Sequence, residues 1–135
     1  MRHSIFTLLI ISTSAFAQVD SFPYFANHTN DISCITFSPD AKYVITGSWD
    51  NTAVVHKNDS TGEAVQTISD FLGAVNTMAF SRDGHRLIIG GQDGILNFYD
   101  FNDSFFQVVT ADTAFQLENT QINKLIYGPG MRTVF

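Results

Sequence analysis

The amino-acid sequence predicts an all-β fold made of repeated antiparallel units of four strands each. The first observation behind this prediction is an internal repeat, in which residues 32–57 align without a gap on residues 75–100, 43 positions further along the chain. Six of the 26 aligned pairs are identical. The second observation is that short runs rich in β-branched and aromatic residues alternate with turn formers in both copies. A fixed period of this size is typical of repeat architectures.

The strands of the first copy follow from this punctuation. Residues 38–41 and 48–51 are predicted turns, because proline fixes φ and aspartate bonds its own backbone. These turns separate three predicted strands, and Thr61-Gly62 precedes a fourth. The four runs are residues 32–37, 42–47, 52–56 and 64–69. The second copy repeats the meander, with turns at residues 81–84 and 91–94.

The segments around the two copies are predicted to hold further strands. Residues 21–25 contain Pro23, which cannot donate to a ladder and therefore suits an edge strand. Residues 104–110 are predicted to be the outer strand of the second unit, and residues 111–120 a connection. Residues 122–127 match residues 32–37 with four residues inserted, which predicts the first strand of a third unit.

Units of about 40–45 residues with four strands resemble the blades of the WD-repeat β-propeller family. The residues that carry the resemblance are Asn27-His28 at the Gly-His place, Ser38-Pro39-Asp40, Gly47-Ser48 before Asp50, Gly90-Gly91 before Asp93, and Tyr99-Asp100 in place of Trp-Asp. His56-Lys57 and Asp70-Phe71 depart from the family pattern. The resemblance implies a propeller segment with an incomplete ring, in units of about residues 20–63, 64–104 and, in part, 105–135.

Residues 1–17 have the three regions of a secretory signal peptide: a basic start at Arg2-His3, an apolar run at residues 5–11, and Ala15-Phe16-Ala17 before Gln18. The apolar run is shorter than the roughly 20 residues that span a bilayer, so no membrane span is expected after cleavage. The sequence therefore predicts a secreted or periplasmic protein, with residues 18–135 as the repeat region. The alternative is a cytoplasmic scaffold with a spurious leader.

Composition argues against several classes of function. The formal net charge is −6, and the seven Lys and Arg residues form no cluster, which disfavours nucleic-acid binding. Cys34 is the only cysteine, so neither an internal disulfide nor a cysteine-based metal site is expected. The sequence shows no Ser-His-Asp order, no glycine-rich phosphate loop and no closely spaced histidine pair. We therefore expect no enzyme, no metal and no cofactor.

The resemblance implies a role for the polar residues near the turns. In WD-repeat blades the histidine, the turn aspartate and a strand Ser or Thr form a structural hydrogen-bond network. His28, Thr46 and Asp50 match this network in the first unit, and His56 occupies the Trp place. In the second unit only Asp93 remains, with Phe71, Ile89 and Tyr99 at the other places.

A binding platform for a protein partner is the function that the resemblance implies. Its partner-binding residues are expected to be Trp49, Gln92, Phe71 and Leu72, on the face where WD-repeat partners dock. Two alternatives stay open: Trp49 folds back over its own blade, or a secreted propeller carries a ligand or enzymatic site in its channel. Because repeat units bury their cores against neighbours, the chain is also expected to be part of a longer propeller or to self-associate.

Three asparagines stand in N-glycosylation sequons: Asn27, Asn58 and Asn102. The last two occupy corresponding turns after the third strand of each unit. Secretion from a eukaryotic cell would make them usable, whereas Asn, Asp and Ser are also ordinary turn formers. Both interpretations stay open from the sequence.

Overall fold

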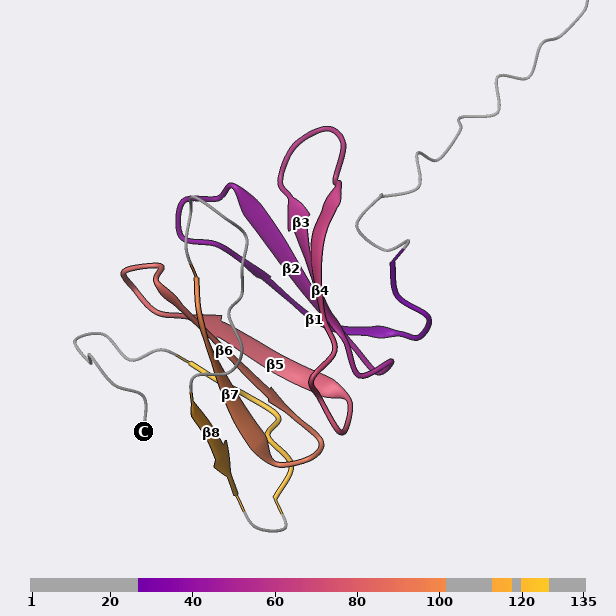
Figure 1. Ribbon diagram of the computed structural model, residues 1–135, viewed down its shortest axis with the longest axis vertical. Coiled ribbons are helices and arrows are strands. Elements are labelled where there is room, and N and C mark those ends of the chain that lie inside the picture. The colour runs from indigo at the N-terminus through magenta and orange to yellow at the C-terminus, as the bar shows by residue number, and fades with distance from the viewer. Residues whose placement is uncertain (1–26, 102–112, 118–119, 127–135) are drawn as a thin grey trace, which may run out of the picture.

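The computed structural model describes residues 27–101, 113–117 and 120–126 (Figure 1). The predicted leader, the predicted strands at residues 21–25 and 104–110, and Asn102 lie outside these described residues. Among the described residues, no helix is long and apolar enough to cross a membrane.

Two four-stranded antiparallel sheets make up the described structure. Blade 1 contains β1 (Ile32–Phe37), β2 (Tyr43–Ser48), β3 (Ala53–Lys57) and β4 (Ala64–Ile68), paired in chain order. Blade 2 contains β5 (Val75–Phe80), β6 (Arg86–Gly91), β7 (Ile95–Asp100) and β8 (Thr113–Gln116), also paired in chain order. The all-β prediction of four-stranded antiparallel units is confirmed.

The outer strand of blade 2 differs from its predicted position. The strand that pairs with β7 is β8, which lies inside residues 111–120, the stretch predicted as a connection. Phe115 of β8 stands opposite Leu96 and makes an edge-to-face contact with Phe98, with ring centroids 6.1 Å apart. This aromatic contact gives Thr113–Gln116 a place on the sheet that its composition did not indicate.

The same side-chain bonds hold the first turn of each blade. In blade 1, Ser38 Oγ donates to Asp40 Oδ1 and accepts from the backbone N–H of Tyr43. Ser81 and Asp83 repeat the pattern in blade 2, where the backbone N–H of Arg86 donates to Ser81 Oγ. Ala41 and Gly84 follow at φ 58° and 76°, so both copies need a left-handed residue here.

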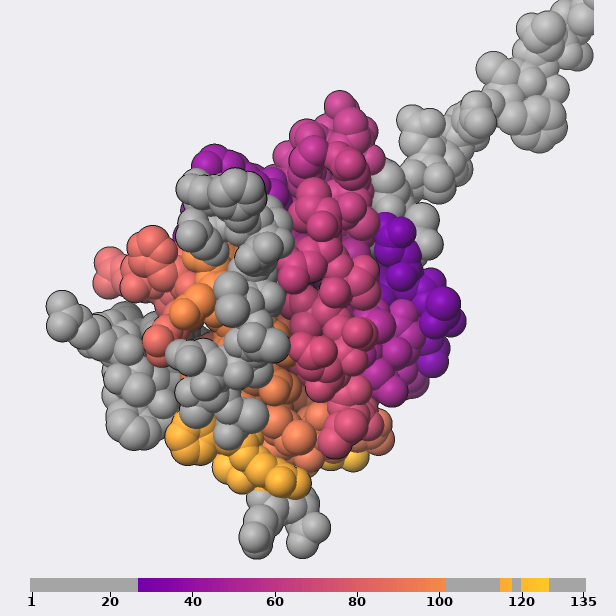
Figure 2. All heavy atoms as spheres, in the orientation of Figure 1, coloured from indigo at the N-terminus to yellow at the C-terminus, as the bar shows by residue number. Residues whose placement is uncertain are grey.

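The blades pack face to face through a close contact at Gly47. A Cβ at Gly47 would lie 2.5 Å from Val75 Cγ1 and 2.7 Å from Cys34 Sγ, so glycine allows β5 to approach β2. Ser33 Oγ also donates to the carbonyl oxygen of Val75 across this seam. Figure 1 shows β1 beside β5, and Figure 2 shows the magenta atoms of blade 1 directly against the orange atoms of blade 2.

The hydrophobic core fills the space between the two sheets. Its buried members come from both blades: Ile45, Ala53, Val55, Ile68, Phe71, Val75, Met78, Leu87, Ile89 and Tyr99. Cys34 packs against this cluster, and burial raises the pKa of its thiol, with hydrogen bonds from Ser33 and Gly47 acting in the opposite direction. The raised pKa disfavours the thiolate, which is the reactive form of cysteine.

A second seam repeats the first on the far side of blade 2. Gly90 is the counterpart of Gly47, and a Cβ there would lie 2.7 Å from Ile122 Cγ2. The backbone N–H of Ile122 donates to the carbonyl of Gly91, and that of Leu125 donates to Thr77 Oγ1. Residues 121–126 thus run along blade 2 where the first strand of a third unit was predicted, although they are not assigned as a strand.

Candidate partner-binding site

The turn between β2 and β3 is fixed by the carboxylate of Asp50. Asp50 Oδ1 accepts from the backbone N–H and the hydroxyl of Thr52, at 2.9 and 2.6 Å. Its Oδ2 accepts from the backbone N–H of Thr29 at 2.9 Å and from Nδ1 of His28 at 3.0 Å. The side chains of His28 and Asp50 are 1% and 7% exposed. One buried carboxylate therefore ties the turn to the segment that precedes β1.

The network continues from His28 into the sheet. Nε2 of His28 lies 2.7 Å from Thr46 Oγ1, which lies 3.3 Å from Nε2 of His56. Nδ1 of His56 lies 3.3 Å from the carbonyl oxygen of Gly62. The structure thus brings together His28, Thr46 and Asp50, the residues that the resemblance implied, and His56 extends their chain where the family places a tryptophan.

Both ends of this chain of contacts are acceptors, the Asp50 carboxylate and the Gly62 carbonyl. The hydroxyl of Thr46 lies between the two imidazoles and also lies 3.4 Å from the carbonyl oxygen of Val54. Nδ1 of His28 lies 3.1 Å from Thr52 Oγ1 as well. The four side chains from Asp50 to His56 therefore form one continuous polar network.

Burial and hydrogen bonding act in opposite directions on the pKa values of His56 and Asp50 in this network. Burial lowers the pKa of His56; the Gly62 carbonyl opposes this effect, and the charge on His28 adds to it. Burial raises the pKa of Asp50, but hydrogen bonds from Thr52, Thr29 and His28 outweigh burial and lower it to about 2. Blade 1 therefore holds an ionised carboxylate inside a hydrogen-bonded network.

Blade 2 fills the same positions with apolar side chains. Phe71 stands where blade 1 has His28, Ile89 where it has Thr46, and Tyr99 where it has His56. All three are buried, and the rings of Phe71 and Tyr99 pack edge to face, 6.3 Å apart. Asp93 still accepts backbone N–H groups, from Ile95 at 2.9 Å and from Leu72 at 3.3 Å. Asp93 thus keeps its role in the turn without the network.

The hydroxyl of Tyr99 lacks the hydrogen bonds that His56 makes at the equivalent position of blade 1. It is buried and finds no hydrogen-bond partner among the described residues. Burial raises the pKa of Tyr99, and the charges of Asp70 and Asp93 raise it further. The phenol therefore stays protonated and acts as a bulky apolar side chain.

Trp49 and Gln92 occupy equivalent turns on one end of the two blades, which we call the turn face. The backbone N–H of Trp49 donates to Asp31 O, and that of Gln92 donates to Ala74 O. The side chain of Trp49 is 57% exposed, so it does not fold back into its own blade. Leu72 is 83% exposed. Phe71 was expected on the same surface, but it is only 8% exposed, because it fills the core position of the missing histidine.

A pocket of about 390 Å³ lies on the turn face between Trp49 and Gln92. Its other lining residues are Asn30, Ala74, Asn76, Gln121 and Asn123. Four of these residues are amides, and none of the four was a predicted site residue. The offset of the repeat could have indicated part of this set, because Ser33, Asn76 and Asn123 are counterparts in successive units.

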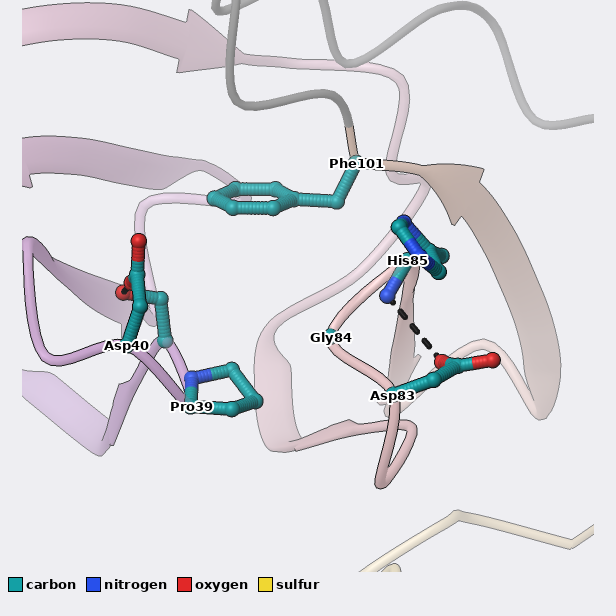
Figure 3. A pocket seen from close by; sticks show the side chains of 7 residues that line it. Pro39, Asp40, Asp83, Gly84, His85 and Phe101 are labelled. Carbon is teal, nitrogen blue, oxygen red and sulfur yellow. Dashed lines mark hydrogen bonds between the residues drawn. The ribbon is translucent and has the colours of Figure 1, made fainter.

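A second pocket, of about 400 Å³, lies at the opposite end of the blades, between their first turns. Figure 3 shows Pro39 and Asp40 from one turn facing Asp83 and His85 from the other, with the ring of Phe101 beside them. Both carboxylates already accept from serine hydroxyls and backbone N–H groups. No group of three metal-ligating side chains occurs among the described residues.

Two of the predicted glycosylation sites fall within the described residues. Asn27 and Asn58 are both exposed. The Nδ2 of Asn58, the atom that would carry a glycan, donates to the carbonyl of Ala41 at 2.7 Å. Glycosylation stays a prediction at both positions.

Comparison with known proteins agrees with this architecture. The family described as "WD domain, G-beta repeat" matches residues 20–57 and 62–100. Periodic tryptophan protein 2 of Arabidopsis thaliana is 34% identical over 74 residues, which are 55% of this chain and 8% of that protein. A guanine nucleotide-binding protein subunit beta of the same plant is 31% identical over 91 residues, which are 67% of this chain and 24% of that protein.

Solved structures show the same fold. The crystal structure of RRP9 WD40 repeats superposes with a TM-score of 0.61 at 19% identity, covering 70% of this chain and 28% of that chain. Of the two curated relatives named above, the chain spans a quarter of the length or less. Because the family match covers residues 20–57 and 62–100, more than half of the sequence, the chain belongs to the WD-repeat family.

Proposed function

We propose that the chain is a non-catalytic WD-repeat scaffold whose turn face binds a protein partner. The observation that carries the proposal is Trp49, a largely exposed indole on a turn that hydrogen bonds hold in place. Tryptophan is enriched among the residues that dominate binding energy at interfaces. An anchor on a rigid turn loses little conformational entropy when a partner docks.

The surroundings of Trp49 support the same proposal. Gln92 lines the same pocket, and Leu72 presents an exposed aliphatic side chain from the segment before β5. Asp50 holds the backbone beneath Trp49, and Asp93 holds the backbone next to Gln92. The turn face therefore combines an aromatic anchor, an amide and an apolar neighbour on a fixed frame.

A matched pair of variants tests the proposal. Trp49→Ala removes the anchor, and His85→Ala removes an exposed ring from the β5–β6 turn at the opposite end of the blades. The wild-type chain and both variants are immobilised, proteins from extracts of the native cells are captured, and the captured proteins are identified and quantified by mass spectrometry. Thermal melts establish that both variants fold.

We expect Trp49→Ala to weaken partner binding by about 2 kcal/mol or more, roughly 30-fold, and His85→Ala to leave it unchanged. A partner retained equally by the wild type and Trp49→Ala contradicts docking at the turn face. A partner lost with His85→Ala instead places docking at the opposite end.

We further propose that the chain is exported and that residues 1–17 are removed. The proposal is supported by the order of a basic start, an apolar run and a small-residue end before Gln18. Mass spectrometry of the native protein checks it. A mature N-terminus at Gln18 is the expected result, whereas a native chain that retains Met1 contradicts export by this leader.

A further inference from the structure

The pocket on the turn face has an unusual lining. Five of its seven residues carry carboxamides, one is Trp49 and one is Ala74; the five are Asn30, Asn76, Gln92, Gln121 and Asn123. They come from three successive units: Asn30 precedes β1, Asn76 lies in β5, and Asn123 lies in the segment docked at the Gly90 seam. None of the lining side chains is charged.

Much of the hydrogen-bonding capacity in this pocket is unused. The side chains of Gln92 and Gln121 make no hydrogen bond with the described residues. Asn76 Nδ2 donates to Asn123 Oδ1 at 3.4 Å, and Asn30 Oδ1 accepts from the backbone N–H of Asp31. A carboxamide has two donor hydrogens and an acceptor oxygen, so each side chain can still pair with a group that both donates and accepts.

We propose that this pocket binds an extended, uncharged peptide segment of the partner, with carboxamides paired to its main-chain amides and an apolar side chain against Trp49. The proposal rests on the proposed function that the turn face docks a protein. Every peptide residue other than proline offers one N–H and one C=O, the pair that a carboxamide matches. The lining crosses from one unit to the next, which suits a chain that repeats this pair along its length.

The lack of charge in the lining disfavours ionic ligands. A charged group gains no opposite charge from this lining, whereas a peptide amide finds both donors and an acceptor in a carboxamide. Anionic ligands also face the chain's net charge of −6. The specificity of the pocket is therefore expected to be a selection against Asp, Glu, Lys and Arg in the bound segment.

Selection of peptides from a displayed library of random 12-residue sequences tests the proposal. Two isosteric variants, Gln92→Glu and Gln121→Glu, keep the size of the side chain but add a negative charge and remove the amide donors. His85→Ala again serves as the control at the opposite end. Trp49 is the only tryptophan of the chain, so its fluorescence reports directly on this pocket.

We expect the selected peptides to be depleted of charged residues relative to the library and to change the emission of Trp49 on binding. Each glutamate variant should weaken their binding about tenfold or more, with an unchanged thermal melt, while His85→Ala should not.

Three results overturn the proposal: no peptide selected, selected peptides rich in charge, or peptide binding that the glutamate variants leave unchanged. A response of Trp49 to neutral oligosaccharides alone, measured with cellohexaose and chitohexaose, overturns it as well. The broader proposal that a protein docks on the turn face fails separately, when an identified whole partner is retained by Trp49→Ala.

Discussion

The two blades have equivalent backbones but stabilise the turn face with different chemistry. Blade 1 uses a polar chain from Asp50 through His28 and Thr46 to His56. Blade 2 keeps only the turn aspartate and fills the other three positions with buried apolar or aromatic side chains. A buried polar network can be replaced by well-packed apolar groups at little cost in stability. The comparison shows that the network is one of two solutions for the same backbone.

The first strands of the two blades also differ, in how far their apolar side chains are exposed. Met78 and Phe80 face blade 1 and pack against the shared core. Their counterparts in blade 1, Ile35 and Phe37, are 49% and 56% exposed. The same position is core in one blade and surface in the other, because only blade 2 has a described neighbour on that side. Self-association through this flank stays a prediction, which sedimentation of the chain would check.

Removing the aspartate from each blade should separate the two designs most strongly. Asp50→Ala removes the acceptor of four donors, and Asp93→Ala that of two backbone N–H groups. We expect losses of about 3 and about 1 kcal/mol, because each variant leaves buried donors unpaired and Asp50→Ala leaves more of them. Chemical denaturation of both variants measures this difference. Equal losses would show that the two turns are equivalent.

The stability of the chain should also depend on pH through Asp50 in blade 1. The pKa of Asp50 is about 2 in the folded state, below its value of 3.8 in the unfolded chain. Its contribution, about 2 kcal/mol, is therefore present above pH 4 and lost as the pH falls toward 2.

Denaturation series for the wild type and Asp50→Asn between pH 2 and 7 check this expectation. The wild type should lose its advantage over Asp50→Asn across that window. A difference that stays constant with pH would exclude a charged Asp50 from the network.

Grafting the network into blade 2 would sharpen the comparison. Ile89→Thr alone should cost about 2 kcal/mol, because it removes one packed methyl group and replaces a methylene with a buried hydroxyl that lacks its partners. The triple variant Phe71→His, Ile89→Thr and Tyr99→His should cost less than the sum of its single changes, because the new side chains pair with one another and with Asp93. Additive losses in the denaturation of the full set would refute interchangeability.

The smallest effect is expected from the leftover hydroxyl of blade 2. Tyr99→Phe removes a buried oxygen that has no partner among the described residues. Stability should stay unchanged or rise by up to about 1 kcal/mol, since the desolvation cost of that oxygen disappears. His56→Phe at the equivalent position of blade 1 serves as the contrast and should be destabilising. A clear loss in the thermal melt of Tyr99→Phe would reveal a bond to that hydroxyl.

The strands that could be predicted from the sequence are those bounded by strong turn formers. The ends of β1 and β5 are marked by Ser38 and Asp40 and by Ser81 and Asp83. The alignment of the two copies then predicts the strands that follow. The outer strand β8 could not be predicted, because residues 104–110 have the stronger β composition, whereas Thr113–Gln116 is favoured by tertiary contacts such as that of Phe115 with Phe98.

The candidate site was predictable in part for a similar reason. Trp49 and Gln92 stand in turns whose position the repeat determines. The amide lining depends on how neighbouring units pack, and Phe71 had to be placed by its contact with Tyr99 rather than by its position before a turn. The network residues His28, Thr46 and Asp50 were predicted through the resemblance. The contact of His56 with the carbonyl of Gly62 was not predictable, because it depends on how the chain turns between β3 and β4.

The glycine seams bear on how such a chain can grow by duplication. Both seams have the same centre, a missing Cβ on one unit, at Gly47 or Gly90, and a branched side chain on the next, at Val75 or Ile122. The second seam forms although the segment before Ile122 is four residues longer than that before Val75. A copied unit can therefore join its predecessor without a newly evolved interface. Differences in length are absorbed by the connections, and the interior of each copy is free to diverge, as the two blades have done.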